Sequence, residues 1–258
     1  TPTRNPIPAQ SLRFGDFYWG YGSGVVATKV PDWGEFVIAE LTQPFNRSDV
    51  SYFFPLMALT EQRLGFRPRT GAFDAAFDAF YVYDYFYRDD DPHAFAAVPF
   101  VRKGGYAAKD RRFAPDGRPL CAAKLPMPQL FTYIDRTLTL IEHERAKYGC
   151  PYKHGAGSDP GPCPINHKRW AKGGCTTTMP TSSGARLRYT LDRESAAYKD
   201  AYRQRTATER INSQAKALGI ERPHLRNGQA ITNRNTLIYT LINLRMLQRI
   251  RQRRPAAD

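Results

Sequence analysis

The chain has 258 residues, 41% apolar and 13% aromatic, enough for one large domain or two small ones with a buried core. Its 38 Lys and Arg residues outnumber 24 Asp and Glu residues and give a net charge of +14. This excess favours a polyanionic partner, nucleic acid before an anionic membrane surface, although a merely basic soluble protein would have the same charge. The sequence shows neither an apolar run near the roughly 20 residues of a membrane span nor an N-terminal signal segment, so we expect a cytoplasmic protein.

Residues 1–16 are typical of a linker, because three prolines are spaced among polar residues. The first residue is not Met, and we expect the chain to be part of a longer protein. Two β-rich runs follow, 17–30 and 35–45, and the turn Pro31-Asp32-Trp33-Gly34 connects them. Runs of this kind joined by a short Pro/Gly turn predict an antiparallel hairpin.

Helical spacing of apolar residues over 49–64 predicts a helix capped by Ser48 or Asp49. The segment 71–86 predicts a strand, a tight turn at Asp74-Ala75-Ala76 and an aromatic-rich helix, whose rings we assign to the core. Residues 94–101 predict another buried strand. The order of hairpin, helix, strand, helix and strand indicates an α/β fold, in which functional sites gather at strand ends.

Residues 104–192 are rich in Gly, Pro and Lys, and their weak periodicity indicates an inserted, irregular subdomain. Residues 193–258 become helical again, with a break at 219–228. The last helix, 235–251, carries a leucine stripe that predicts core packing. The members of this stripe are Leu237, Leu241, Leu244 and Leu247, with Ile238, Ile242 and Met246 beside them. The basic tail, RIRQRR, would contact phosphates or form a solvated end.

The segment YRQRTATERINSQAK carries Tyr202, Arg205, Glu209 and Lys216 at offsets of 0, 3, 7 and 14. On a helix these offsets place a phenol, a guanidinium, a carboxylate and an amine on one stripe. The apolar positions Ile211, Ala215 and Leu218 fall on a different face. Spacing alone is also compatible with a solvated surface on which Arg205 and Glu209 form an ordinary i,i+4 pair.

The pattern Y-x2-R-x3-E-x6-K resembles the signature that closes the catalytic domain of bacterial insertion-sequence transposases of the DDE type. The resemblance implies a ribonuclease H-like (retroviral-integrase superfamily) α/β fold, a mixed sheet with flanking helices and an inserted Cys-bearing subdomain. The catalytic core would then comprise 17–103 and 193–258. In that family the Glu at the position of Glu209 is the last acidic residue of the catalytic triad.

The word Asp74-Ala75-Ala76-Phe77 resembles the family's D-x-(G/A)-(Y/F) word, which carries the second catalytic Asp at a strand end. The resemblance makes Asp74 and Glu209 ligands of Mg²⁺ or Mn²⁺, and we assign Asp78 to a helper or capping role. Two such ions can activate a nucleophile and stabilise the leaving oxygen of a phosphodiester. Arg205 and Lys216 fit as phosphate clamps, and Tyr202 fits as a phosphate or base contact.

The first catalytic Asp of the family has no convincing counterpart, and we expect it before Thr1. Double-stranded DNA, as transposon ends and target, is the implied partner of a nucleoid-associated homo-oligomer that cleaves and transfers strands. A catalytically inactive, truncated or domesticated DNA-binding relative is the alternative, and a zinc-dependent RNA-binding module is a third.

All four cysteines lie in the expected insertion, at Cys121, Cys150, Cys163 and Cys175. Two Cys-Pro words with His154 and His167 nearby indicate a structural zinc site. No C-x2-C pair is present, and scattered reduced cysteines are the alternative. Disulfides are not expected in a cytosolic protein.

Overall fold

The structure is a computed structural model that describes residues 9–13, 16–101, 111–136, 141–155 and 163–253. The chain divides into two compact units. The first joins Thr1–Phe77 to Glu194–Asp258, and the second is the continuous segment Asp78–Arg193. The expected insertion, 104–192, ends within one residue of this second unit but begins later than it does.

The first unit is built on an antiparallel sheet in the order β1-β2-β3. Its strands are β1 (Ala9–Arg13), β2 (Asp16–Val30) and β3 (Gly34–Pro44). The long β2–β3 hairpin confirms the predicted one, whereas β1 occupies part of the segment expected to be a linker.

A β-bulge interrupts the hairpin, because Val26 pairs with Ala39 and Ala27 with Val37, which leaves Ile38 as an extra residue. The freed Ile38 carbonyl accepts a hydrogen bond from the Arg63 guanidinium at 2.5 Å. Buried and half-buried residues alternate along the first half of β3, as the two-residue period of a strand requires.

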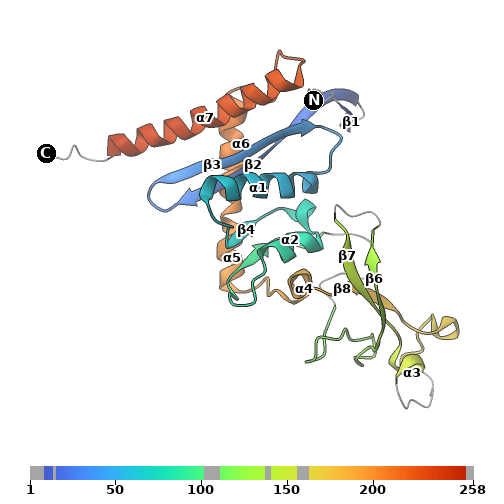
Figure 1. The fold of residues 1–258 in the computed structure, drawn as a ribbon. Coiled ribbons are helices and arrows are strands. Elements are labelled where there is room, and N and C mark those ends of the chain that lie inside the picture. Colours follow the sequence, from blue (N-terminus) through green and yellow to red (C-terminus); the bar gives the residue numbers. More distant parts are fainter. Residues whose placement is uncertain (1–8, 14–15, 102–110, 137–140, 156–162, 254–258) are drawn as a thin grey trace. The chain divides into compact units, whose positions relative to one another are not determined.

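Several helical segments accompany this hairpin in the first unit. They are η1 (Asp49–Tyr52), α1 (Phe53–Leu64), α5 (Ala196–Arg203), α6 (Arg205–Ala217) and α7 (Gly228–Arg253). Helices α7 and α1 run along opposite sides of the hairpin (Figure 1). Tyr52, at the end of η1, packs closely against β2 because β2 has Gly24 at this contact. A Cβ on Gly24 would lie 2.4 Å from the Tyr52 ring.

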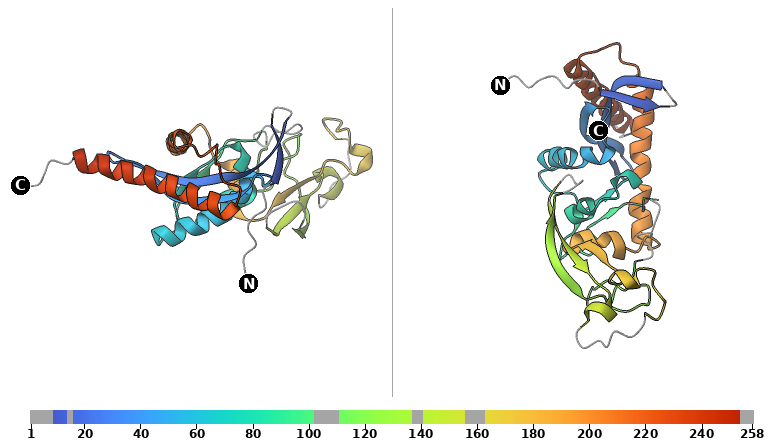
Figure 2. Two further views of the ribbon diagram at one scale, coloured as in Figure 1. Left: turned by 90° about the horizontal axis from the view of Figure 1, so that it is seen from above. Right: turned by 90° about the vertical axis from the view of Figure 1, so that its right-hand side faces the viewer.

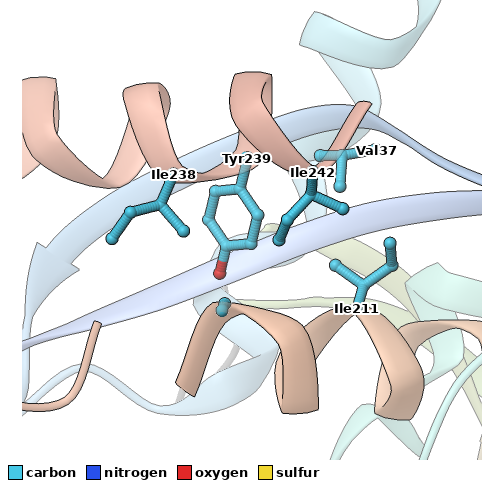
Figure 3. Packing of buried hydrophobic residues seen from close by; sticks show 6 residues of the cluster. Val37, Ile211, Ile238, Tyr239 and Ile242 are labelled. Carbon is cyan, nitrogen blue, oxygen red and sulfur yellow. The ribbon is translucent and has the colours of Figure 1, made fainter. Parts of the chain in front are cut away.

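The core of the first unit lies where α6 and α7 meet the hairpin (Figure 3). Its buried members are Val37, Ile211, Ala215, Ile238, Tyr239 and Ile242. A side-chain amide reinforces the contact, because Asn243 accepts from the Val37 N–H and donates to the Val37 carbonyl, both at 2.8 Å. Helix α7 therefore supplies hydrogen bonds as well as apolar surface to β3.

The four leucines of the last helix do not form this core, and the prediction is wrong for them, whereas it is confirmed for Ile238 and Ile242 beside them. Leu237 is 69% exposed and Leu244 55%, while Ile238 and Ile242 on the neighbouring face are buried. Two apolar stripes run side by side on α7, and the sheet covers the one with β-branched residues. Periodicity marks both stripes equally, so it could not choose between them.

The remaining elements of the first unit are the short strand β4 (Thr70–Ala72) and the 3₁₀ turn η2 (Ala75–Phe77). The tight turn predicted at 74–76 is therefore present. It follows the end of β4, with Phe73 between the strand and the turn.

The second unit contains two short helices that pack on each other, α2 (Phe80–Phe86) and α4 (Ser183–Thr190). Gly184 allows their close approach, because a Cβ there would lie 2.6 Å from the side chains of Asp84 and Tyr87. The aromatic residues of α2 are mostly buried, which confirms their predicted place in the core. The contact between α2 and α4 explains why this unit begins near residue 78 and not at 104.

A three-stranded antiparallel sheet, β6-β7-β8, forms the other half of the second unit. Its strands are β6 (Gln129–Asp135), β7 (His143–Tyr148) and β8 (Thr177–Pro180), accompanied by β5 (Phe95–Ala97), α3 (Pro151–His154) and η4 (Trp170–Lys172). The segment expected to be irregular thus holds regular structure. Its core contains Met127, Ala146, Tyr148 and Met179.

A buried ion pair joins the two ends of the second unit. The Asp78 carboxylate is fully buried and contacts the Arg188 guanidinium at 2.7 Å, and it also accepts from the Val101 N–H at 2.9 Å. Burial opposes ionisation of Asp78, but the bonds and charge of Arg188 outweigh it, so the pKa is lowered. Asp78 therefore has a structural role instead of capping a helix.

The whole is a mixed α/β protein of small sheets and helices. The ribonuclease H-like arrangement stays a prediction.

Candidate functional site

Helices α5 and α6 place the signature residues along one rod. They are separated only by Gln204, whose backbone is itself helical, with φ −64° and ψ −20°. Figures 1 and 2 show α5 and α6 running almost end to end. Tyr202 therefore lies on α5, and Arg205, Glu209 and Lys216 lie on α6.

Arg205 stands at the centre of a chain of contacts on this rod. Its guanidinium contacts the Glu209 carboxylate at 2.7 Å and lies 5.6 Å from the centre of the Tyr202 ring. Tyr202 is in turn stacked on Tyr198, with ring centres 5.9 Å apart. The structure thus brings together three of the four signature residues, on a surface that solvent reaches, since Glu209 is 55% exposed.

Lys216 does not join this group. Its amine pairs with Glu221 at 2.9 Å, one turn beyond the end of α6. The opposite face of α6 carries the buried Ala207, Ile211 and Ala215, so the predicted separation of polar and apolar faces is confirmed.

Asp74 lies two residues beyond β4, and β4 packs on α5, the helix that carries Tyr202. Its carboxylate accepts a hydrogen bond from the Ala76 N–H at 2.8 Å, and its carbonyl accepts from the Phe77 N–H at 3.1 Å. The carboxylate is exposed and held at a strand end, as the sequence predicted. Among the described residues, no ion pair or hydrogen bond connects Asp74 to Glu209.

Asp49 lies close to Asp74, a proximity that sequence reasoning missed. The pKa of Asp49 is raised, first by desolvation and then by the negative charge of Asp74. The sequence assigned a cap at Ser48 or Asp49, but the Ser48 side chain makes no capping bond. No sequence signal could have identified this pair, because η1 and η2 meet only in the folded unit.

Two neighbouring carboxylates suit a hard divalent cation. Mg²⁺ prefers oxygen ligands, retains several waters and binds through one or two carboxylates. A cation beside Asp49 and Asp74 would also relieve the repulsion that raises the pKa of Asp49. Within the described ranges, however, no group of three or more His, Cys, Asp or Glu side chains is arranged to hold a metal ion.

The predicted zinc ligands are partly brought together. Cys150 and Cys175 are hydrogen-bonded through their thiols, and Cys121 lies near enough to act on Cys175 electrostatically. Burial, then these neighbouring thiols, raise the pKa of Cys175. Cys163 is placed on a separate turn, in which its carbonyl accepts from the Asn166 N–H at 2.9 Å. All four cysteines are free thiols.

The C-terminal half of α7 presents positive charge. The helix contains no acidic residue, and four of its arginines are exposed along its last nine positions. They are Arg245, Arg249, Arg251 and Arg253. The exposed Leu247 lies between them and the exposed Leu244 directly precedes them, so this part of the helix combines apolar and cationic side chains.

Comparison with known proteins returned no match to a protein family, to a curated protein or to a solved structure. Among the helices that the structure describes, none is long and apolar enough to cross a membrane.

Proposed function

We propose that this protein is a DDE-type transposase that cleaves DNA at the ends of an insertion sequence and transfers the strands to target DNA. The observation that carries the proposal is the contact chain of Tyr202, Arg205 and Glu209 on the α5–α6 rod. The packing of β4 on α5 adds support, because it holds the Asp74 turn near the same rod. The fold around these residues is mixed α/β, as such an enzyme requires.

Each site residue has a distinct role in this proposal. Asp74 and Glu209 would hold Mg²⁺ or Mn²⁺, and Asp49 would add negative charge beside Asp74. The bound ions would activate the attacking hydroxyl and stabilise the leaving oxygen. Arg205 has one partner in the free protein and another in the DNA complex. Its guanidinium pairs with Glu209 in the free protein and would pair with a phosphate when DNA binds.

Tyr202 and Lys216 support the DNA in this proposal. Tyr202 presents a ring that Tyr198 holds in place by stacking, which suits contact with a displaced base. Lys216 supplies a point charge for a phosphate once it leaves Glu221. We further propose that the protein assembles as a homo-oligomer on double-stranded DNA in the nucleoid.

The metal part of the proposal is tested by Mn²⁺ binding, followed by electron paramagnetic resonance, together with Mn²⁺-dependent cleavage of supercoiled DNA. We expect Asp74→Asn and Glu209→Gln each to weaken Mn²⁺ binding at least about tenfold, equivalent to about 1.4 kcal/mol. The matched control is Asp200→Asn, which removes the exposed i,i+3 pair of Asp200 with Arg203 on α5. Equal Mn²⁺ binding by all four proteins would contradict the assignment of Asp74 and Glu209.

A catalytically inactive DNA-binding protein is the second candidate. It is favoured by the exposed arginines of α7 and by the lack of a three-carboxylate group within the described ranges. Under this alternative, Asp74→Asn and Glu209→Gln would leave DNA affinity unchanged, and neither they nor the unaltered protein would cut DNA in Mn²⁺.

A further inference from the structure

Two of the four cysteines meet at one end of the β6-β7-β8 sheet, and a third lies near them. In the antiparallel register of β7 and β8, Tyr148 faces Thr177. Cys150 and Cys175 each lie two residues beyond this pair, so continuation of the same register places them opposite each other. Their thiols are hydrogen-bonded, and Cys150 is buried.

Cys121 approaches from a tight turn in a different part of the second unit. In this turn its N–H donates to the Leu125 carbonyl and its carbonyl accepts from the Lys124 N–H, both at 2.9 Å. The segment that follows this turn is hydrogen-bonded to the residue before Cys150, because the Gly149 N–H donates to the Pro128 carbonyl at 3.0 Å. Cys121 and Cys175 pack against the same hydrophobic cluster.

The backbone beside Cys175 is shaped for close approach to Cys150. Gly174 has a φ of +83°, and a Cβ on it would lie 2.6 Å from the Cys150 Cβ and 3.0 Å from its Sγ. Only glycine meets both conditions without displacing the thiol. Two thiols thus meet where the chain accepts no side chain between them, and Cys121 lies near. Among the described residues no three such side chains are already arranged around a metal ion, so metal binding has to draw the thiols together.

The fourth cysteine is placed on the loop that leads into this cluster. Cys150 and Cys163 both precede proline, and both carbonyls accept an N–H from the residue three positions later. The chain from Cys163 runs through η4 directly to Cys175. All four cysteines of the protein belong to the second unit.

We propose that Cys121, Cys150 and Cys175 bind a structural zinc ion and that Cys163 supplies the fourth thiolate. A closed tetrahedral set of thiolates is the arrangement that zinc adopts in structural sites. Zinc binding would displace the thiol protons. The thiolates of Cys121, Cys150 and Cys175 would turn toward the ion by rotation about their Cα–Cβ bonds, and movement of the 163–175 loop would bring Cys163 to it. The site stabilises the end of the β7–β8 pair, and its chemistry does not depend on the transposase proposal.

The test uses the whole chain, purified under reducing conditions from zinc-supplemented cells. We expect one zinc ion per chain by elemental analysis, and four thiolates released when a mercurial displaces the metal. Replacement of zinc by Co²⁺ should give the thiolate-to-metal charge-transfer absorption and the ligand-field bands of a tetrahedral sulfur site. Substoichiometric zinc together with no charge-transfer band on adding Co²⁺ would overturn the proposal.

Single serine variants locate the ligands. Cys150→Ser and Cys175→Ser should lose the metal, and Cys163→Ser should retain at most a weakened site with an altered cobalt spectrum. Met179→Leu, a buried change in the same core, controls for loss of packing and should keep full zinc. If a Cys→Ser variant fails to fold, mercurial titration of the unaltered protein still decides the thiolate count. A four-thiolate cobalt spectrum in Cys163→Ser would overturn the fourth ligand.

Discussion

Arg205 contacts the Glu209 carboxylate and lies over the Tyr202 ring, yet it remains on a surface that solvent reaches. Exposed i,i+4 pairs contribute only about 0.3–0.5 kcal/mol, so Arg205→Ala should barely change the unfolding temperature. DNA affinity should fall, and the slope of log affinity against log salt should decrease by about one. Binding titrations at several salt concentrations check this result. Arg203→Ala, which removes the neighbouring pair with Asp200, is the control and should leave the slope unchanged.

Asp78 makes the opposite kind of contact, because its carboxylate is removed from water and bound to Arg188. Removal of one partner from a buried ion pair leaves the other charge uncompensated, which costs about 3–5 kcal/mol. We therefore expect Asp78→Ala to destabilise the protein by an amount in this range in urea unfolding. An effect below about 1 kcal/mol would show that the pair is hydrated in solution.

The same carboxylate gives stability a dependence on pH. Because the folded pKa of Asp78 is lowered, its contribution is fully present above the unfolded Asp pKa of about 3.9. That contribution is lost as the pH falls through the folded pKa. Urea unfolding below about pH 4 should therefore lose stability more steeply in the unaltered protein than in Asp78→Asn. Parallel pH profiles for the two proteins would contradict this linkage.

At the scale of an element, α7 presents two apolar faces with opposite expected sensitivities. Ile242 is almost fully buried between α6 and the hairpin, so Ile242→Ala should cost about 2–5 kcal/mol. Leu244 is 55% exposed, so Leu244→Ala should change stability by no more than about 0.5 kcal/mol. Chemical denaturation of both variants compares the two faces directly. Equal losses would mean that the leucine stripe is covered in solution.

Helix α7 also depends on a polar contact with the hairpin. The Asn243 amide satisfies both backbone groups of Val37, next to the bulge at Ile38. Asn243→Leu would leave a donor and an acceptor without partners, which we expect to cost about 1–3 kcal/mol. Hydrogen exchange should show faster exchange of the Val37 amide in this variant. Gln248→Leu, an exposed change on the same helix, serves as the control.

At the scale of the whole molecule, the net charge of +14 is less informative than its location. If the end of α7 contacts DNA, then changing Arg245, Arg249 and Arg251 to Gln should decrease the salt slope by about 3. The control changes three exposed cations of the second unit, Lys124, Arg136 and Lys168, to Gln and alters the net charge equally. Equal losses of affinity would show that the attraction is general and not due to α7.

Prediction from the sequence succeeded where the determining contacts are local. The hairpin, the helix that ends at Leu64 and the turn at Asp74 each follow from neighbouring residues. The sheet β6-β7-β8 was not predicted, because β6 is largely exposed and the pairing of β7 with β8 joins residues distant in sequence. The prediction assigned the leucines of α7 to the core for a related reason, since only the sheet that packs on the helix determines which of its apolar faces is buried.

The candidate site divides in the same way. The contacts of Tyr202, Arg205 and Glu209 follow from helical spacing and were predictable. The proximity of Asp49 to Asp74 arises from tertiary packing, and so does the opposition of Cys150 and Cys175 across a strand pair. Residue types had identified these cysteines as a group, but only the strand register places Cys150 beside Cys175.

The discontinuous first unit has a consequence for the order of folding. Its two parts are separated in sequence by Asp78–Arg193, and closing a flexible loop of this length would cost about 4 kcal/mol in chain entropy. The inserted unit holds its own two ends together, through Asp78 with Arg188 and through Arg193 with the Val98 carbonyl at 3.0 Å. Once the insert has folded, its two ends lie together, so it acts as a short connection between β4 and α5. The chain entropy of closing this loop has then already been lost. Refolding of α6 and α7 onto the hairpin should therefore follow protection of α2 and α4 in pulsed hydrogen exchange, and Arg188→Ala should slow it.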